Sequence, residues 1–513
     1  MERFLERHQS RVSGVLTGFD RVLFRGTLGS ISYLDGLQGF VKYHGILYKN
    51  FGRCAQDLAQ SLNDRAMRIV EQSGRPYIYL ESASRSKEMV AQDIALRDHV
   101  TEGLICVLGC VEPCQRCSIP KDAATKALKL VPAKRKCLHY YFYDRDREFG
   151  PMHVRLESWL PFSIQVYVNG REYLARRLEK ARIGFEKRDN CFTRIDDLKR
   201  AQGMLDDLMS REWERFLNAL ARRVNPLRDA DRGWELRGYY WTIRQSEVAT
   251  DVMVRTAAAL EEIYPRLVGH ASEGFRCKDV LRFLGRRLTA AKTEEVTSEL
   301  RELAEGVRIK HRVGENSIKM YDKQKGVLRI ETTINNPRPF RACREMIRDG
   351  RPGVEGLPMR KGLADMARRV EISRAANQRY LEALAVGGEP APTRKVLDPL
   401  SKRVQKEGRP YRALRPIAPE DNDLFAAVMR GEHLLDGFRN RDIREAIAPG
   451  VRPRSARGRS VAGRGTRYVR LLRAHGLIRK VPRTQLDRIT PKGHHAMTTA
   501  LKLRELDVTG IAA

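Results

Sequence analysis

Two segments of the chain place apolar residues at every second position, which is the pattern of β-strands with one buried face. In Lys136–Trp159 the apolar positions are Leu138, Tyr140, Phe142, Met152, Val154 and Leu156. In Ser317–Asn335 they are Ile318, Met320, Leu328, Ile330 and Ile334. Each segment has a polar stretch at its middle, so each predicts a long β-hairpin. Such hairpins must bury their apolar faces, which restricts the chain to folds built on a packed sheet.

The other face of the first hairpin gathers polar and aromatic side chains: His139, Tyr141, Tyr143, His153, Arg155 and Glu157. With the turn centred near Arg147, Tyr141 opposes His153, and His139 opposes Arg155. Imidazoles, a carboxylate and an arginine on one face can ligate a divalent metal or hold a phosphodiester, which makes His153 and Glu157 candidate catalytic groups. The alternative is a solvated sheet face that binds nucleic acid through its rings, or that has no ligand.

The second hairpin repeats this arrangement with Lys319, Tyr321, Lys323, Arg329, Glu331 and Thr333 on its polar face. A turn near Lys325 sets Tyr321 opposite Arg329, and Lys319 opposite Glu331. A tyrosine flanked by cations could attack a phosphodiester, because a positive field lowers the cost of the phenolate. The alternative is that both are ordinary cross-strand pairs.

The second hairpin resembles the catalytic domain of rolling-circle replication initiator proteins, in which a "YDK" strand precedes an "R-x-E" strand. The matching residues are Tyr321, Asp322, Lys323, Arg329 and Glu331. The resemblance implies a DNA-nicking site with Tyr321 and Glu331 in catalytic roles. The chain departs from the related relaxase pattern because it has no His-hydrophobic-His triplet.

The remaining pattern predicts an α+β multidomain protein. Residues 1–200 alternate strand-like and helix-like segments and predict a mixed α/β domain that includes the first hairpin. Residues 201–300 are expected to be helical, and residues 301–385 to contain the second hairpin and a helix. Residues 386–419, rich in Gly, Pro and basic residues, predict a linker. Residues 420–513 predict a winged helix-turn-helix.

The winged helix-turn-helix is expected from two helices and a hairpin. A short helix follows Gly437, a second ends at Gly476, and strands are expected at Leu477–Val481 and Leu486–Thr490. The Gly/Arg-rich stretch Ser455–Gly465, where the second helix should begin, is a poor helix former. The order of elements resembles the winged helix of MarR-like bacterial regulators.

That resemblance implies binding to double-stranded DNA. Between Val451 and Lys492 there are 13 Lys and Arg residues against one acidic residue, Asp487. Candidate phosphate and base contacts are Arg467, Arg470 and Arg473 on the helix and Arg479, Lys480 and Arg483 on the wing. The alternative is a basic domain that binds another protein.

The composition of the whole chain supports a polyanionic partner. Its 96 Lys and Arg against 64 Asp and Glu give a net charge of +32, which favours nucleic acid over an anionic membrane surface. No run approaches the ~18 apolar residues that span a bilayer, and the N-terminus has no apolar signal core, so a cytoplasmic location is expected. The oligomeric state stays open, with a homodimer as one option.

A second candidate catalytic set consists of the carboxylates Asp20, Glu112 and Glu157. Asp20 begins the first strand, and Glu112 follows a buried one. If the three met, they would suit an Mg²⁺ or Mn²⁺ site for phosphodiester chemistry, as in RNase H-like folds. An Asp at a strand start is otherwise a cap or an ion-pair partner. Asp189, Asn190 and Asp251 are expected at the surface.

A zinc site is the remaining metal hypothesis. Cys114-x2-Cys117, followed by Cys137 and His139, could supply four ligands, although Cys-x-His is a poor second half. Nine cysteines at uneven spacing do not form a disulfide framework.

These expectations together favour a DNA-processing protein of replication-initiator or transposase type from a bacterial mobile element. A winged-helix transcriptional regulator with a large sensor or partner-binding N-terminal region is the first alternative, and an RNA-binding protein that stacks bases on aromatic sheet faces is the second. Since no P-loop motif occurs, ATP-driven activity is not expected.

Overall fold

The computed structural model describes residues 1–209, 211–228, 236, 238–286, 295–303, 306–348, 351–385, 393–430, 433, 437–450, 456–482 and 484–505. Two compact units are present, and we describe each by itself. The sheet unit comprises Ser13–Val254 and Glu315–Arg374, and the terminal unit comprises Met1–Val12, Arg255–Gly314 and Ala375–Ala513. The fold combines helices and strands, as expected from the sequence, and it contains a large mixed sheet that joins both predicted hairpins.

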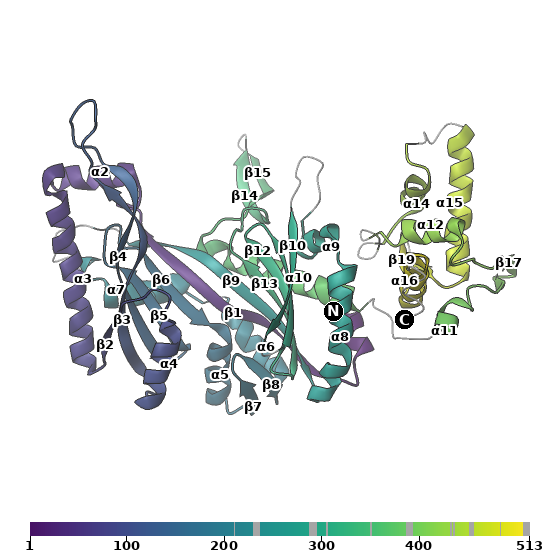
Figure 1. Ribbon diagram of the computed structural model, residues 1–513, viewed down its shortest axis with the longest axis horizontal. Coiled ribbons are helices and arrows are strands. Elements are labelled where there is room, and N and C mark those ends of the chain that lie inside the picture. Colours follow the sequence, from purple (N-terminus) through teal and green to yellow (C-terminus); the bar gives the residue numbers. More distant parts are fainter. Residues whose placement is uncertain are drawn as a thin grey trace. The chain divides into compact units, whose positions relative to one another are not determined.

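The sheet unit is built on strands in the order β12-β13-β9-β1-β6-β5-β4-β3-β2 (Figure 1). β2 pairs in parallel with β3, whereas β4, β5, β6, β9 and β13 make antiparallel pairs. The bounds are β1 Val12–Leu28, β2 Tyr77–Leu80, β3 Gly103–Ser118, β4 Val131–Asp146, β5 Gly150–Glu157, β6 Ile164–Asn169, β9 Tyr239–Val254, β12 Asn316–Lys323 and β13 Val327–Ile334.

One face of this sheet packs on the main hydrophobic core, and we call it the core face. Its covering helices are α2 Leu34–Tyr43, α3 Phe51–Ser73 and α7 Trp213–Val224. The alternation expected for the first hairpin is confirmed, since Phe142, Val154 and Leu156 lie in this core. The strands face the helices with the apolar positions that the sequence pattern singles out.

The opposite face is covered at two places by other elements, and we call it the polar face. Near β3 and β4 it packs against α4 Lys87–Arg97. Near β1 and β9 it packs against α5 Gly170–Lys180, α6 Leu198–Asp207 and the hairpin of β7 Phe185–Arg188 and β8 Cys191–Ile195. Ser86 caps α4 and Asn169 caps α5, each accepting from backbone N–H groups of the first turn.

The register of the second hairpin is as predicted. Tyr321 pairs with Arg329, and Lys319 pairs with Glu331. The register of the first hairpin is two residues from the prediction, because Tyr141 pairs with Arg155 and Tyr143 pairs with His153.

The side chain of Asp146 explains the error in the first hairpin. Asp146 Oδ1 accepts from the backbone N–H groups of Glu148 and Phe149 at 2.8 Å each, and Gly150 adopts φ +60°. The turn is therefore centred near Glu148 rather than Arg147. A shift of two residues keeps every side chain on its predicted face.

The expectation that residues 201–300 are helical is wrong for β9, a strand of 16 residues. It is also wrong at the end of the region, where β10 Val296–Leu303 begins, and the other main elements are α6, α7, α8 Ala257–Gly274 and α9 Cys277–Phe283. From Ser246 to Val254 every residue of β9 is buried. A strand buried on both faces lacks the apolar–polar alternation by which strands are recognised.

The terminal unit contains the hairpin of β10 Val296–Leu303 and β11 Gly306–Val313, and the C-terminal elements. The latter are α11 Thr393–Leu397, β16 Val404–Lys406, β17 Arg409–Tyr411, α12 Pro419–Val428, α14 Asn440–Ile447, α15 Ala456–Ala474, β18 Ile478–Lys480, β19 Asp487–Ile489 and α16 Pro491–Glu505. They share one core. Helix α1 Glu2–Arg7 also belongs to this unit, α10 Met366–Leu384 spans the junction, and the sheet unit adds the hairpin of β14 Arg341–Arg348 and β15 Arg351–Pro358.

Two sequence expectations for the C-terminal region are corrected. The described part of 386–419 is not a plain linker, because Leu397, Leu400 and Leu414 are buried in the C-terminal core. The stretch Ser455–Gly465 is helical from Ala456 onward, since α15 runs unbroken to Ala474. The apolar side of the helix, which includes Val469 and Leu472, packs into that core and offsets the low helix propensity of its glycines.

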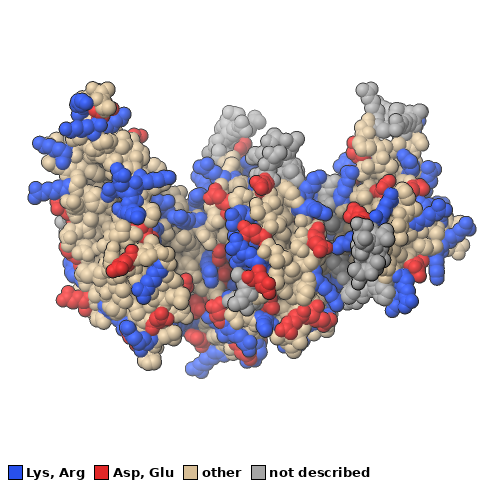
Figure 2. Space-filling view, viewed as in Figure 1, with Lys and Arg blue, Asp and Glu red and all other residues tan. Residues whose placement is uncertain are grey.

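No helix in the described part of the chain has the length and apolar character needed to cross a membrane. On the face seen in Figure 2, Lys and Arg side chains are spread widely over the surface, with Asp and Glu side chains between them.

Candidate metal centre

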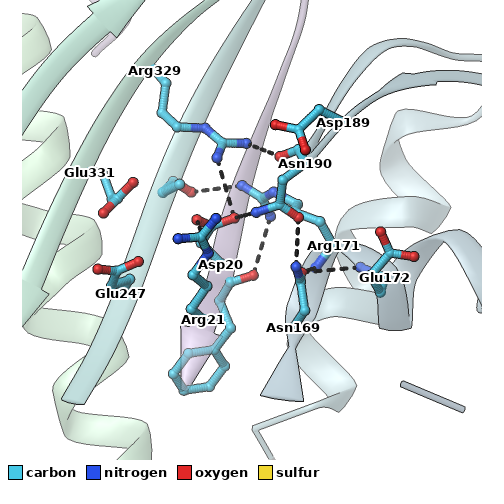
Figure 3. A network of polar contacts seen from close by, with 12 residues as sticks. Asp20, Arg21, Asn169, Arg171, Glu172, Asp189, Asn190, Glu247, Arg329 and Glu331 are labelled. Atoms are coloured by element: carbon cyan, nitrogen blue, oxygen red, sulfur yellow. Dashed lines mark hydrogen bonds and ion pairs between the residues drawn. The ribbon is translucent and has the colours of Figure 1, made fainter. Parts of the chain in front are cut away.

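Three buried carboxylates from three neighbouring strands meet on the polar face of the sheet. Asp20 lies on β1, Glu247 on β9 and Glu331 on β13, and one carboxylate oxygen of each lies within 4.8 Å of the others (Figure 3). Their exposed fractions are only 2%, 7% and 1%. In the described part of the chain this is the single group of three acidic, His or Cys side chains close enough to share a metal ion. We call it the carboxylate triad.

A local irregularity in β1 turns Asp20 toward the triad. Phe19 and Val22 are three residues apart, and both lie in the main core. An extra residue between two core-facing positions is the signature of a β-bulge, and it sends both Asp20 and Arg21 to the polar face. Figure 3 shows the two side chains beside each other, and the side chain of Arg21 is 49% exposed.

Glu331 is held by its neighbours on β12. Lys319 Nζ lies 2.6 Å from Glu331 Oε1, and the hydroxyl of Tyr321 donates to Oε2 at 2.7 Å. Burial raises the pKa of Glu331, but Lys319 and then Arg329 outweigh it and bring the pKa to about 2. Glu331 is therefore ionised at neutral pH.

The other two triad members are harder to ionise. Burial, followed by repulsion from Glu331, raises the pKa of Glu247 to about 7, although Lys319 acts in the opposite direction. Burial also raises the pKa of Asp20, while Arg329 lowers it. A cation bound between the three would stabilise the charged forms of both.

A buried ion-pair network supports the triad from behind. Arg329 donates from Nε and Nη2 to the two oxygens of Asp251 at 2.6 and 2.9 Å, and Arg171 Nη2 lies 2.9 Å from Asp251 Oδ2. Burial raises the pKa of Asp251, but Arg171 and Arg329 outweigh it and lower the pKa overall. Asp20 joins the network through Arg329 Nη1 at 3.3 Å. These side chains are at most 2% exposed, so their geometry is set by one another.

Asn190, on the turn between β7 and β8, completes this network. Its Nδ2 donates to Asp20 Oδ1 at 2.6 Å, and its backbone oxygen accepts from Arg329 Nη2 at 2.7 Å. Its Oδ1 accepts from Asn169, the residue that also caps α5. Asn190 and Asp251 are buried, so the expectation that they lie at the surface is wrong.

The electrostatics at Tyr321 are the reverse of those expected from the sequence. Burial and then Glu331 raise the pKa of Tyr321 well above its ordinary value, and Arg329 offsets this only in part. The phenol stays neutral as the donor to Glu331. The neighbouring Lys323 is paired with Asp189 on the turn between β7 and β8.

The structure does not bring Asp20, Glu112 and Glu157 together as one group of three within the described residues. Glu112 accepts from Tyr141 at 2.7 Å and from Arg155 at 3.1 Å, and Lys87 lies 2.7 Å from its other oxygen. Glu157 faces His139 at 3.8 Å. Both carboxylates therefore have partners of their own on β4, β5 and α4.

His153 lies within a row of aromatic rings. It is parallel to Tyr167, with ring centroids 5.2 Å apart, and tilted against Tyr143 at 5.0 Å. Burial, followed by the charge of Arg155, lowers the pKa of His153 to about 4. The imidazole is therefore neutral at pH 7. The face expected to be solvated is largely covered, since Tyr141 and Tyr143 pack with α4.

The four residues proposed for zinc do not converge in the described structure. Cys114 and Cys137 are diagonal neighbours across β3 and β4, and their thiols are hydrogen-bonded. Cys117 is three residues from Cys114 along the same strand, so it faces the opposite side. His139 turns its Nδ1 to the backbone oxygen of Cys137 at 3.1 Å.

In the C-terminal region Arg467, Arg470, Arg479 and Lys480 are exposed. Arg473 instead donates from Nε and Nη2 to the two carboxylate oxygens of Asp487 on β19, at 2.7 and 2.6 Å. It ties α15 to the hairpin. Arg483 lies outside the described residues.

No protein-family model, no curated protein and no solved structure matches this chain.

Sequence reasoning missed Glu247, Arg171 and Arg21, and it placed Asp251 at the surface. Glu247 and Asp251 lie on the strand taken for a helix, and Arg21 directly follows Asp20, which the sequence analysis does single out. The clearest available signal was "VATDVMV" in β9, which is rich in β-branched residues and carries one acid in an apolar run.

Proposed function

We propose that this chain is a DNA-processing protein that cuts or transfers phosphodiester bonds with Mg²⁺ or Mn²⁺ held by Asp20, Glu247 and Glu331. The observation that carries the proposal is the meeting of three buried carboxylates from three strands. Acidic side chains are almost never buried without a partner, and two of these three have raised pKa values.

The donor set fits a hard divalent cation. Carboxylate oxygens are the ligands that Mg²⁺ and Mn²⁺ prefer, whereas zinc sites favour Cys and His. Adjacent ligands of octahedral Mg²⁺ are about 2.9 Å apart, so the three oxygens, which lie within 4.8 Å of one another, would draw closer together when they bind one ion. When bound, such an ion polarises a phosphoryl oxygen and lowers the pKa of a bound water.

The residues around the triad have separate roles in this proposal. Arg21 and Lys319 stabilise negative charge that develops on the phosphoryl group. Glu247 is a ligand in this proposal, and the bound cation lowers the pKa that burial raises to about 7 in the metal-free chain. Tyr321 orients Glu331 through its hydrogen bond and is a positioning residue rather than the nucleophile.

The C-terminal elements supply the means of reaching DNA. We propose that α14, α15 and the hairpin of β18 and β19 form a winged helix that binds double-stranded DNA through exposed cations. Support comes from the element order and from Arg467 and Arg470, which lie one helical turn apart and are both exposed. The bidentate pair of Arg473 and Asp487 would hold the helix and the wing in a fixed arrangement.

A plasmid-nicking assay tests the proposal. Purified protein should convert supercoiled plasmid to open circles in Mg²⁺ or Mn²⁺, and Glu247→Gln should lower the rate at least ~100-fold. Glu186→Gln is the matched control, because Glu186 is an exposed carboxylate of β7 outside the triad. Protein that binds DNA but leaves its strands intact with either metal would refute the enzymatic function.

The second candidate is a winged-helix transcriptional regulator. The observation that favours it is Lys319, whose ammonium lies 2.6 Å from Glu331 and 3.8 Å from Glu247. A built-in cation at two of the three carboxylates suits a purely structural cluster. Binding to duplex DNA without any strand cleavage would support this function.

A further inference from the structure

A second charged feature lies on the polar face, farther along β1 from the triad. Arg25 of β1 pairs across the sheet with Gln165 of β6, and Gln165 pairs with Arg155 of β5. With the side-chain amide of Gln165 in its flipped orientation, Oε1 accepts hydrogen bonds from Arg155 Nη1 at 2.8 Å and from Arg244 Nη1 of β9 at 3.1 Å. Two guanidinium groups thus donate to one neutral amide, and the charge of Arg25 acts on Arg244. We call Arg25, Arg155 and Arg244 the arginine cluster.

The positive charge of this cluster is only partly balanced. Arg155 is paired with Glu112, and Glu157 is the acid that acts on Arg244. Burial, followed by the charges of Arg25 and Arg155, lowers the pKa of Arg244. The Nε of Arg25 is buried and has no hydrogen-bond partner among the described residues. A bound phosphate would reduce the repulsion between these guanidinium groups and accept their hydrogen bonds.

An apolar strip separates the arginine cluster from the triad. Leu23 lies between Arg21 and Arg25 on β1, and it pairs with Tyr167, which in turn pairs with His153. Leu23, Tyr167 and His153 are all partly exposed. The four steps from Arg21 to Arg25 span about 13 Å along the strand. The order along this face is therefore carboxylate triad, Arg21, apolar strip, arginine cluster.

We propose that this track binds a single-stranded nucleic acid, with one phosphate at the arginine cluster, sugars and bases along the strip of Leu23, Tyr167 and His153, and the scissile phosphate at Arg21 and the triad. Cations alternating with planar and apolar side chains are what single strands require, because their bases are exposed for stacking. A phosphate held by Arg25 and Arg244 would position the nucleic-acid strand relative to the carboxylates. The binding site stands on its own contacts, and only the cleavage step rests on the proposed function.

Binding measurements without metal test the track. In EDTA, fluorescence anisotropy of the full chain with labelled oligothymidylate should show about tenfold weaker binding for the double variant Arg25→Gln/Arg244→Gln. The slope of log affinity against log salt should fall by about 0.7 for each lost phosphate contact. The double variant Arg25→Lys/Arg244→Lys should have most of the parent's salt slope, because lysine keeps the positive charge at both positions. Unfolding temperatures near that of the parent identify variants that have kept their fold.

The controls separate the track from general charge effects. Arg215→Gln removes a side chain that is 86% exposed on α7, which packs on the core face, and it should leave oligothymidylate binding unchanged. Binding of a duplex should be equal in the parent and the double variant. An equal loss for single-stranded and duplex probes, or no loss at all, would overturn the inference.

Two further arms identify the source of the strand and separate the two proposals. Oligouridylate in place of oligothymidylate tells whether RNA or DNA is preferred, and the double variant should weaken the preferred one. Glu247→Gln should retain binding while it abolishes nicking. If the parent chain does not nick DNA but the double variant loses single-strand binding, the proposed function fails and the track stands.

Discussion

The ammonium of Lys319 lies 2.6 Å from Oε1 of Glu331, directly across the β12–β13 pair. It also lies 3.8 Å from Oε1 of Glu247. The ammonium of Lys319 therefore supplies part of the positive charge that a divalent cation would bring to the triad. Lysine and metal ion compete for the same carboxylates, which gives the metal hypothesis a direct thermodynamic test.

Removing Lys319 should make the fold depend on metal. Lys319→Met leaves Glu331 buried without its nearest counter-charge, a change that costs about 3–5 kcal/mol for a buried pair. Mn²⁺ should therefore raise the unfolding temperature of this variant by more than it raises that of the parent. Differential scanning fluorimetry measures both shifts.

Lys323→Met is the control for that experiment, because Lys323 pairs with Asp189 outside the triad. Its response to Mn²⁺ should equal that of the parent. A Lys319→Met protein whose unfolding temperature does not respond to Mn²⁺ would speak against a metal at the triad.

Glu247 should make stability depend on pH. Its pKa is about 7 in the folded chain against an ordinary value of 4.5, so the protonated form favours folding. The stability that it contributes is complete below pH 4.5 and is lost as the pH rises through 7. The loss amounts to at most about 3 kcal/mol. Glu247→Gln should therefore be stabilised relative to the parent at pH 8 and much less so at pH 4.5, as measured by urea unfolding without metal. Parallel pH profiles for the two proteins would contradict the assignment.

The network behind the triad should be essential for folding. Arg329→Met removes a charged partner of both Asp20 and Asp251, and we expect a loss of about 3–5 kcal/mol in the free energy of unfolding. Adding Asp251→Asn should recover part of that loss, because Asp251 keeps only Arg171 as a cationic partner once Arg329 is gone. Arg194→Ala, which breaks only exposed ion pairs, should cost no more than about 1 kcal/mol. An additive double variant would show that Arg329 and Asp251 are not coupled.

Two arginines of α15 should behave differently in the C-terminal region. Arg470→Ala should weaken duplex binding and lower its salt slope by about 0.9, because the exposed side chain is placed for a phosphate contact. Arg473→Ala should chiefly lower the unfolding temperature, because that side chain holds Asp487. Anisotropy with a labelled duplex and thermal unfolding separate the two effects. If both variants had the same salt slope, the different roles assigned to Arg470 and Arg473 would be wrong.

How far the sequence predicts this fold depends on local signals. The second hairpin is centred by its own polar turn, so the pairs of Tyr321 with Arg329 and of Lys319 with Glu331 follow from alternation alone. In the first hairpin the faces are predictable, but the register depends on how one side chain, Asp146, folds the turn. Alternation determines the face, and turn chemistry determines the partner.

The triad lies beyond such local signals. Asp20 and Arg329 are 309 residues apart in sequence, and they meet because β1, β9 and β13 are neighbours in the sheet. No single segment of the sequence determines that strand order. Glu247 was missed because buried β9 shows no alternation, and Asp20 was placed with Glu112 and Glu157, which have their own partners. Long-range strand order was the missing information.

Mn²⁺ binding measured by electron paramagnetic resonance tests the central claim most directly, because it reports the loss of aqueous Mn²⁺ independently of any activity. The account predicts that the parent chain binds Mn²⁺ at the triad, that Glu331→Gln and Asp20→Asn each abolish this binding, and that Glu186→Gln leaves it unchanged. Equal Mn²⁺ binding by the parent and by both triad variants would contradict the account.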